Sequence, residues 1–346
     1  MLAEKMTNRS ALIDAFLLEA GWSAASRHPL AGDASFRRYE RVIQADKPAM
    51  LMDAPPPQED VTPFIRVTQL LRSYGHSAPE IYAQDTASGF LLLEDLGEDL
   101  YSAVLRADGE QEEALYLAAA ELLVDLYHRY ETVGKAHVLE PYDETVMLRE
   151  VGLFADWFLP QAVGLNKARS LKEEYMVLWR DILAQAGLRQ HVPVLRDYHA
   201  DNLMWLPERN GLQRVGLLDY QDALLGDTAY DLVSFLEDAR RDVSSAVIEK
   251  VLDYFIAATQ QDRDAFMKRY AVLGAQRNSK IIGIFTRLCV RDGKPHYLAF
   301  LPRVWGWLEH DLYHPLLAPL AAWLDAHVPA PMRGAFEADS TIGSIE

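Results

Sequence analysis

The strongest constraint on the fold is a run of three apolar segments, joined by acidic loops, between residues 192 and 231. The apolar segments read Val-Pro-Val-Leu at 192–195, Leu-Met-Trp-Leu at 203–206 and Val-Gly-Leu-Leu at 215–218. Short apolar runs bounded by polar turns are typical of buried strands. Arg-Asp-Tyr-His-Ala-Asp-Asn at 196–202 joins the first two segments, Asp-Tyr-Gln-Asp at 219–222 follows the third, and Gly-Asp-Thr-Ala-Tyr-Asp at 226–231 ends the run. The sequence therefore predicts three strands whose ends gather acidic side chains.

The spacing of these polar residues indicates a particular chemistry. Asp197 and Asn202 stand five positions apart and Asp219 follows a hydrophobic strand, which is the pattern of the protein-kinase catalytic loop and metal-binding carboxylate. Phosphoryl transfer requires a carboxylate to orient and deprotonate the attacking hydroxyl, and oxygen ligands for Mg²⁺ on the triphosphate. We therefore expect Asp197 to be the base, and Asn202 and Asp219 to bind Mg²⁺. Taken singly, each residue also suits a helix cap or a turn.

Composition limits the partners and the compartment. The protein has 346 residues, enough for two lobes with separate cores, and its net charge of −17 disfavours nucleic acid and anionic membranes as partners. The single cysteine, Cys289, excludes an intramolecular disulfide and is expected to be a small buried residue in a reducing compartment. Neither a secretion signal nor an apolar run of membrane-spanning length is found. We expect a cytoplasmic monomer.

Hydrophobic periodicity predicts an α+β protein with a small β-rich N-terminal lobe at 1–96 and a larger helical C-terminal lobe at 97–346. In the first lobe we expect an opening helix, strands at 35–44, 49–52, 81–83 and 90–93, and a helix at 61–74. In the second lobe we expect helices at 110–132, 143–158, 167–186, 228–238, 244–259, 262–291 with a possible break, and 303–325.

The connection between the lobes is a candidate for binding adenine. The segment Phe-Leu-Leu-Leu-Glu-Asp-Leu-Gly at 90–97 ends a buried strand in two acids. In a kinase-like fold such a segment offers backbone carbonyl and amide groups to the adenine edge, so Glu94 and Leu96 would act through their backbones. An ordinary strand-to-helix turn is the alternative.

The triphosphate is expected to lie near the first strand pair. Ser35, Arg37 and Arg38 precede or open this pair and carry hydroxyl and guanidinium donors. The second strand usually carries a lysine to the α- and β-phosphates, yet Ala-Met-Leu-Met at 49–52 has none. We hypothesise that Arg37 or Arg38 replaces it. Glu59 and Asp60 are left without a role, because the lysine that such an acid would pair with is missing.

The arrangement as a whole resembles the aminoglycoside phosphotransferase/choline kinase-like family. The resemblance is carried by Asp197, Asn202, Asp219 and the segment Gly-Asp-Thr-Ala-Tyr-Asp at 226–231, and it covers most of the sequence. It implies a bilobal protein-kinase-like fold, ATP as co-substrate and Mg²⁺. Three narrower segments resemble the anomeric sugar kinases of this family: Gly-Asp-Ala-Ser-Phe-Arg-Arg-Tyr at 32–39, Met-Asp-Ala-Pro-Pro-Pro at 52–57 and Gln-Arg-Asn-Ser-Lys-Ile-Ile-Gly-Ile-Phe at 276–285.

The narrower resemblance implies a substrate and a reaction. It implies a kinase that phosphorylates the C1 hydroxyl of N-acetylmuramate and N-acetylglucosamine during recycling of cell-wall peptidoglycan. Two alternatives stay open at this point. One is a different small-molecule phosphotransferase, acting on an aminoglycoside, choline or homoserine, and the other is a catalytically silent nucleotide-binding module, which the missing lysine makes conceivable.

The sugar is expected to meet a basic stripe on the helix at 262–291. Arg277, Lys280, Arg287 and Arg291 fall within about 80° of one another on a helical wheel. A solvated amphipathic face would explain this pattern. The functional hypothesis is that Arg277 or Lys280 binds an anionic group such as the lactyl carboxylate of muramate.

Two residues of the predicted catalytic loop are further candidates for the sugar pocket. Tyr198 and His199 lie between the expected base and the expected metal ligand. A buried, hydrogen-bonded structural role suits both equally well. Asp227 and Asp231 are expected to brace the loop.

Overall fold

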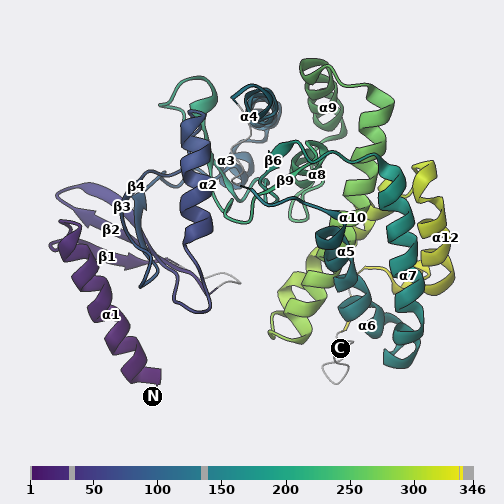
Figure 1. Cartoon of the computed structure of the whole chain (residues 1–346), viewed down its shortest axis with the longest axis horizontal. Helices are drawn as coiled ribbons and strands as arrows, with labels where there is room; N and C mark the ends of the chain where they lie inside the picture. Colours follow the sequence, from purple (N-terminus) through teal and green to yellow (C-terminus); the bar gives the residue numbers. More distant parts are fainter. Residues whose placement is uncertain (1, 31–35, 134–138, 335, 338–346) are drawn as a thin grey trace. The chain divides into compact units, whose positions relative to one another are not determined.

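The computed structural model describes residues 2–30, 36–133, 139–334 and 336–337 (Figure 1). The protein forms two compact units, and neither is continuous in sequence. Unit 1 comprises Met1–Gln111 and Asp201–Asp222, and unit 2 comprises Glu112–Ala200 and Ala223–Glu346. This division differs from a single boundary after residue 96, because the segment 97–111 and the hairpin within 201–222 pack with the N-terminal sheet unit. Bridges Leu100 to Met204 and Ser77 to Gly216 join these parts.

Unit 1 is built on an antiparallel five-stranded sheet. The strand order is β1-β2-β3-β5-β4, and every neighbouring pair is antiparallel. The strands are β1 (Ser26–Pro29), β2 (Arg38–Gln44), β3 (Lys47–Asp53), β4 (Ile81–Asp85) and β5 (Phe90–Glu94). The predicted hairpin and the two later strands are confirmed. β1 was not predicted, because Ser-Arg-His-Pro has no apolar alternation.

The two faces of this sheet have different partners. Side chains alternate along a strand, so Ala49 and Leu51 lie on one face while Met50 and Met52 lie on the other. The first face forms a core with α1 (Leu2–Glu19), which buries its Phe16 there. Complete burial of one such side chain contributes roughly 1.5–3 kcal/mol to the stability of the folded state. The second face borders a cavity.

Two helices and a hairpin also belong to unit 1. They are α2 (Thr62–Ser73), α3 (Tyr101–Ala107) and a hairpin of β7 (Leu203–Trp205) with β8 (Val215–Leu217). α2 begins with a proline in its first turn and buries an apolar stripe that includes Phe64. Short 3₁₀ turns lie at Gly109–Gln111 and Gly211–Arg214. α2 and both strands of the hairpin were predicted within a few residues.

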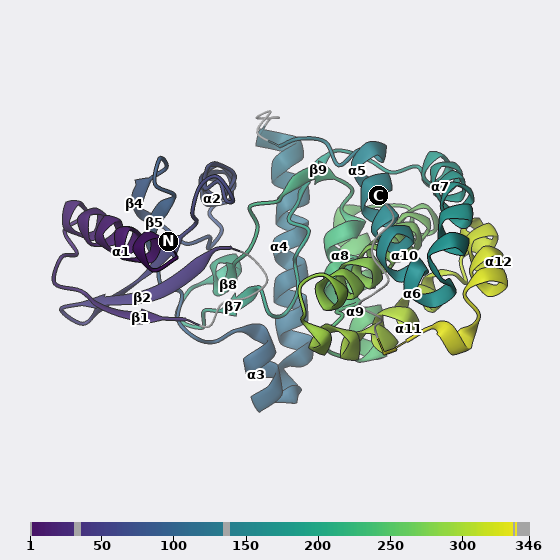
Figure 2. The same ribbon diagram turned by 90° about the horizontal axis from the view of Figure 1, so that it is seen from below.

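Unit 2 is helical around one short strand pair, β6 (Val192–Val194) with β9 (Leu224–Gly226). Its helices are α4 (Glu112–Val133), α5 (Glu144–Leu153), α6 (Leu159–Val163), α7 (Leu165–Ala186), α8 (Ala229–Leu236), α9 (Ser245–Thr259), α10 (Arg263–Val290), α11 (Leu301–Asp311) and α12 (Ala318–His327). A π-helical segment, Phe154–Phe158, joins α5 to α6, and 3₁₀ turns lie at Pro295–Phe300, Pro315–Leu317 and Ala330–Met332. Figure 2 shows these helices from below.

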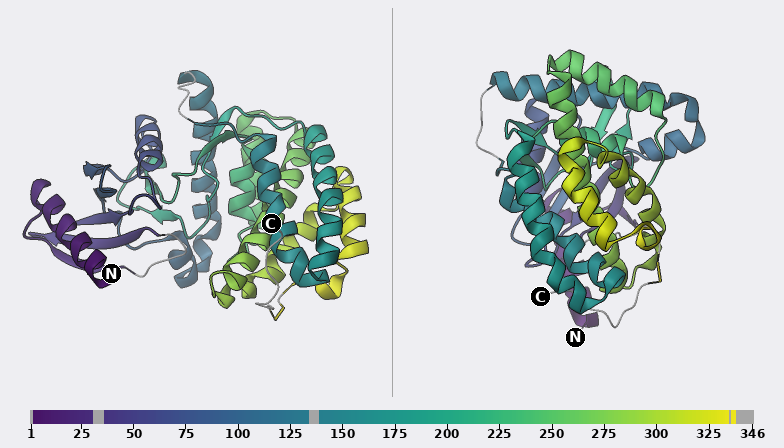
Figure 3. Two further views of the ribbon diagram at one scale, coloured as in Figure 1. Left: turned by 60° about the horizontal axis from the view of Figure 1, so that its bottom comes forward. Right: turned by 90° about the vertical axis from the view of Figure 1, so that its right-hand side faces the viewer.

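α10 is the central helix of unit 2. It packs against α5, α8 and α11, while α12 lies beside α7 (Figure 3). The helix runs unbroken over 28 residues, so the possible break predicted at 262–291 does not occur. The expected helix at 303–325 is instead divided, because Pro315 follows α11 and starts a 3₁₀ turn before α12. No helix within the described ranges is long and apolar enough to cross a membrane.

Candidate active site

A cavity of about 420 Å³ lies in unit 1, between the second face of the sheet and the β7–β8 hairpin. Its walls are largely apolar and are formed by Leu30, Met50, Met52, Phe64, Pro79, Leu93, Leu96, Met204 and Leu218. Its polar lining consists of Arg37, Tyr39, Glu94, Asp95, Asn202 and Asp219. A concave apolar pocket with a few polar groups at one side suits a flat organic ligand with a charged end. We name this cavity the nucleotide pocket, after the ligand that the sequence predicts for residues of its lining.

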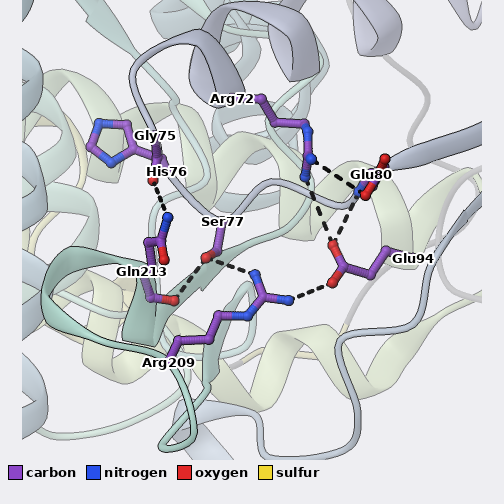
Figure 4. A pocket seen from close by; sticks show the side chains of 8 residues that line it. All are labelled: Arg72, Gly75, His76, Ser77, Glu80, Glu94, Arg209 and Gln213. Carbon is purple, nitrogen blue, oxygen red and sulfur yellow. Dashed lines mark hydrogen bonds and ion pairs between the residues drawn. The ribbon is translucent and has the colours of Figure 1, made fainter.

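Glu94 borders this pocket at the end of β5, but its carboxylate is held elsewhere. The Glu94 N–H donates to the Glu80 C=O at 2.8 Å, and the carboxylate accepts a hydrogen bond from Arg209. Figure 4 shows this carboxylate in a second, polar cavity of about 310 Å³, with Arg72 and Arg209 on either side. Any contact of Glu94 with a nucleotide would therefore come from its backbone carbonyl. Leu96, two residues on, lines the nucleotide pocket.

The segment after Glu94 is fixed by an arginine from β2. Arg41 binds the Asp95 carboxylate through Nε at 2.6 Å and Nη2 at 3.3 Å, and Nη2 also donates to the Gly97 C=O at 3.2 Å. The Asp95 carboxylate in turn accepts the Gly97 N–H at 2.9 Å. Bidentate arginine–carboxylate pairs restrict geometry in two directions. The connecting segment is thus held in one conformation from within unit 1.

The predicted phosphate-binding residues differ in whether they line the pocket. Arg37 lines the nucleotide pocket, on the same face as Tyr39. Arg38 does not, since it is exposed at the start of β2 and alternation turns it to the opposite face. Arg38 is therefore absent from the lining of this pocket, and its contact with phosphate stays a prediction from the sequence. Ser35 lies outside the described residues.

The two predicted metal ligands both line the nucleotide pocket. Asn202 precedes β7 and Asp219 follows β8, and the Leu218 N–H donates to the Asn202 C=O at 3.0 Å. Asp219 has a φ of 54°, a left-handed conformation that is costly for a residue with a Cβ and is often found at functional sites. Its Oδ1 accepts from Gln221 Nε2 at 3.0 Å. Amide and carboxylate oxygens fit Mg²⁺, which uses one or two protein ligands together with phosphates and water.

The predicted base, Asp197, lies in unit 2, in a loop whose backbone is held by hydrogen bonds from Asp231 and Ser234. The Asp231 carboxylate accepts the N–H of Leu195 at 2.7 Å and the N–H of Arg196 at 2.8 Å. Ser234 donates to the Arg196 C=O at 3.2 Å, and Arg196 has a φ of 73°. These bonds hold a strained backbone just before Asp197.

Basic side chains of unit 2 act on the carboxyl group of Asp197. Burial would raise the pKa of its carboxyl group, but Lys280, followed by His199, Arg277 and Arg196, outweighs burial and lowers that pKa. Asp197 is therefore a carboxylate at neutral pH, as a proton acceptor must be.

The middle of the predicted basic stripe is not a solvated face. Arg277 is only 4% exposed, and its Nη1 has no hydrogen-bond partner among the described residues. The Lys280 side chain is 12% exposed and lies 3.2 Å from both a Glu150 oxygen and the Tyr230 hydroxyl. Only the C-terminal end of the stripe matches the alternative of a solvated amphipathic face, since Arg291 is exposed. Cys289, expected to be buried, is half-buried on the same helix.

Glu150 of α5 was missed by the sequence analysis. Its buried carboxylate accepts hydrogen bonds from Arg196, Tyr142 and Gln276 in addition to the contact with Lys280. Burial opposes its ionisation, yet Lys280 and Arg196 lower its pKa to about 2. The signal was present in the periodicity, since Glu150 shares the buried helical face with Met147 and Val151.

Tyr198 and His199 occupy core positions. Tyr198 is 2% exposed, donates its hydroxyl to the Ala119 C=O at 2.8 Å and packs edge-on against Phe235. His199 is 5% exposed, with Nε2 3.4 Å from Arg240 Nη1. Burial and Arg240 lower the pKa of His199. These placements match the structural alternative for Tyr198, and a contact of either residue with sugar stays a prediction from the sequence.

The fold and the pocket define a phosphotransferase with a protein-kinase-like architecture, and comparisons with known proteins bear this out. Residues 26–267 match the Phosphotransferase enzyme family. The protein belongs to this family. A choline kinase from Streptococcus pneumoniae is similar in structure, with a TM-score of 0.60 and 12% identity over 90% of this chain and 99% of that one. An aminoglycoside phosphotransferase solved with streptomycin and ATP has a TM-score of 0.54 and 15% identity over 88% of this chain and 96% of that one.

Curated relatives are closer in sequence. A protein of Caulobacter vibrioides named N-acetylmuramate/N-acetylglucosamine kinase is 37% identical over 94% of this chain and 99% of its own length. A protein of Pseudomonas aeruginosa with the same name is 40% identical over 87% of this chain and 88% of its own length. The α+β, bilobal, protein-kinase-like fold expected from the sequence is thus confirmed, and the protein is a phosphotransferase.

Proposed function

We propose that this protein is an ATP-dependent kinase that transfers the γ-phosphoryl group to the C1 hydroxyl of N-acetylmuramate and N-acetylglucosamine. The observation that carries the proposal is the 37% identity, over nearly the whole of both proteins, with an enzyme named for these two sugars. The residues of the candidate site supply the groups that such a transfer needs. Recycling of cell-wall sugars in the cytoplasm, by a monomer, stays a prediction from the sequence.

In the proposed complex, ATP occupies the nucleotide pocket. The adenine lies against Met50, Met52 and Met204, whose flexible, polarisable side chains pack against an aromatic ring. The C=O of Glu94 and the N–H of Leu96 provide an acceptor and a donor for its edge. Arg37, whose planar guanidinium matches phosphate oxygens, takes the place of the missing strand lysine.

Mg²⁺ would be held by Asn202 and Asp219, which border the same pocket. When bound, it would neutralise negative charge on the phosphate groups of the nucleotide.

The role of Asp197 is to orient the C1 hydroxyl and accept its proton. The bond from the sugar oxygen to the γ-phosphorus forms while the bond from that phosphorus to the β-bridging oxygen breaks, so ADP leaves and the proton passes to Asp197. An anomeric hydroxyl is more acidic than an ordinary alcohol, so a carboxylate with a lowered pKa suffices as acceptor. Most of the acceleration would come from positioning and charge.

We propose that Arg277 and Lys280 bind the carboxylate of N-acetylmuramate. Both are shielded from solvent, and Arg277 has an unused donor among the described residues. A buried donor without a partner is costly, which a carboxylate ligand would relieve. An aminoglycoside is a polycation and would be repelled by these two side chains.

An ADP-release assay tests this function. The purified protein is incubated with MgATP and, in separate reactions, N-acetylmuramate, N-acetylglucosamine, choline, homoserine, an aminoglycoside or no acceptor. We expect ADP release only in the reactions that contain N-acetylmuramate or N-acetylglucosamine. Phosphorus NMR of their products should show the phosphate attached at C1. Faster release with choline, homoserine or an aminoglycoside would reject the proposal, as would phosphorylation at another hydroxyl.

A further inference from the structure

Arg37 is the sole lysine or arginine among the described residues that line the nucleotide pocket. The lysine of β3, Lys47, stands exposed at the hairpin end, opposite Gln44. In protein kinases the phosphate-binding lysine is itself fixed by a glutamate from a neighbouring helix. A guanidinium on a loop needs such a partner even more, because its long side chain has many rotamers.

Glu59 provides such a partner, and its two carboxylate oxygens make different contacts. Oε2 lies 3.4 Å from Nε of Arg37, and Oε1 accepts the backbone N–H of Phe36 at 3.2 Å. The Glu59 N–H donates to the Pro55 C=O at 3.1 Å, which ties Glu59 to the end of β3. One carboxylate thus restrains the guanidinium of Arg37 and the backbone just before it.

The same guanidinium also approaches the expected metal ligand. Nη1 of Arg37 lies 3.6 Å from Oδ1 of Asp219. The Arg37 and Glu59 side chains are 15% and 18% exposed, so the pair is partly shielded from water. Both distances exceed the 2.7–2.9 Å or so of a tight charge-assisted hydrogen bond, which leaves room for phosphate oxygens to compete for the donors.

We propose that Glu59 is a positioning residue that presents Arg37 to the phosphates of the nucleotide. An arginine–glutamate pair, formed between the segment before β2 and the segment before α2, then replaces the lysine–glutamate pair of other kinases. This inference rests on the proposed nucleotide site. Glu59 acts through Arg37 and touches neither substrate itself.

Binding of ATP and of adenosine to single and double variants tests the proposal by calorimetry in the presence of Mg²⁺. Glu59→Gln should weaken ATP about tenfold, the size expected for misplacing one charge-assisted contact, and leave adenosine unchanged. Arg37→Ala should weaken ATP at least as much. Because Glu59 acts through Arg37, the double variant should bind ATP no more weakly than Arg37→Ala alone.

Glu40→Gln is the matched control. Glu40 pairs with Arg27 through two contacts on the opposite face of the same sheet, so its loss should leave ATP affinity unchanged. If Glu59→Gln does not fold, Glu59→Asp, with a carboxylate drawn back by one methylene, gives the same comparison.

Three outcomes would overturn the positioning role. Equal weakening of ATP and adenosine would show that Glu59 merely supports the fold. An ATP affinity that falls in Arg37→Ala but not in Glu59→Gln would leave the proposed role of Arg37 intact and remove that of Glu59. If ATP affinity is unchanged in both variants, the proposed roles of Arg37 and Glu59 are both rejected. The proposed sugar specificity is tested separately, by the ADP-release assay.

Discussion

At the scale of single residues, Lys280 is shared between two carboxylates. It is the largest influence that lowers the pKa of Asp197 and also of Glu150, in each case against burial. Its own pKa is raised: burial lowers it, but Tyr230, Glu150 and Asp197 more than compensate. Lys280 therefore lowers the pKa of Asp197, while an ion pair with Glu150 at 3.2 Å holds Lys280 in place.

Replacing Lys280 should change the pH dependence of turnover. A base acts only when deprotonated, so the rate falls as the pH drops through the pKa of Asp197. Lys280→Met removes the cation that lowers this pKa, so the acid limb of the kcat profile should move to higher pH. The profile is measured with saturating N-acetylglucosamine, which has no carboxylate. Lys172→Met, which breaks a partly exposed pair with Asp156, is the control and should leave the limb unmoved. A lower kcat with an unmoved limb would contradict this role.

Replacing Arg277 should change the choice of sugar. The proposed partner of its unused donor is the lactyl carboxylate, which N-acetylglucosamine lacks. Arg277→Met should therefore lower kcat/KM for N-acetylmuramate about tenfold or more relative to N-acetylglucosamine, as for loss of a charge-assisted hydrogen bond. Equal losses for the two sugars would show that Arg277 supports Asp197 or the fold instead.

The sequence identified residues whose spacing reflects their chemistry. Asn202 and Asp219 could be predicted in this way, and the structure places both at one pocket. Glu59 and Glu150 could not be assigned roles, because each depends on an ion pair across more than twenty residues that only tertiary structure brings together. Arg37 and Arg38 both suit phosphate by chemistry, and only the structure shows that Arg37 lines the pocket while Arg38 does not.

At the scale of elements, α10 and α5 approach each other unusually closely. A Cβ built on Gly283 of α10 would overlap with the backbone of Leu153 and Phe154, where α5 becomes the π-helical segment. The glycine therefore permits the contact that brings Lys280 and Glu150 together. Sequence periodicity predicted both helices, but it contains no information on the distance between them.

Gly283→Ala should destabilise unit 2. The added methyl group would force the two helices apart at a cost of about 1–3 kcal/mol. Gly306→Ala on α11 is the matched control, because a Cβ added there would have no atom within 4 Å. In a helix interior that change should stabilise by roughly 0.5–1 kcal/mol. The two variants are compared by urea unfolding, and equal effects would mean that the close approach is not a constraint.

At the scale of the whole molecule, the polypeptide passes between its two compact units more than once. Hydrophobic patterning predicted most helices and strands, but not that 201–222 belongs with the N-terminal unit. That assignment depends on pairings such as Ser77 with Gly216, which are remote in sequence and leave no periodic signal. The elements and the fold class could therefore be predicted from patterning, whereas the membership of the units required the structure.

Buried acids in unit 2 should make stability depend on pH. Burial raises the pKa of Glu237 to about 7 and that of Asp311 well above its usual range, and Asn278 Nδ2 bridges them at 2.8 and 3.0 Å. A carboxyl group with a raised pKa in the folded state favours folding at low pH, and this advantage is lost as the pH rises from about 4.5 to about 7.

Glu237→Gln removes this titration, since an amide stays neutral. The melting temperature of the variant should therefore rise relative to that of the unmodified protein as the pH increases from 5 to 8. Thermal unfolding followed by circular dichroism measures this difference at each pH. If the difference in melting temperature between the two proteins does not change with pH, the raised pKa of Glu237 is contradicted.

The proposed reaction depends on Asp197 accepting the proton of the sugar hydroxyl. Single-turnover measurements on Asp197→Asn, beside Asp201→Asn from the same loop, test it most directly. We expect the phosphoryl-transfer rate of Asp197→Asn to fall by about 10²–10⁴, the usual contribution of a general base, while ATP affinity and the rate of Asp201→Asn stay near those of the unmodified protein. A transfer rate in Asp197→Asn within a few-fold of that of the unmodified protein would show that Asp197 is not the base.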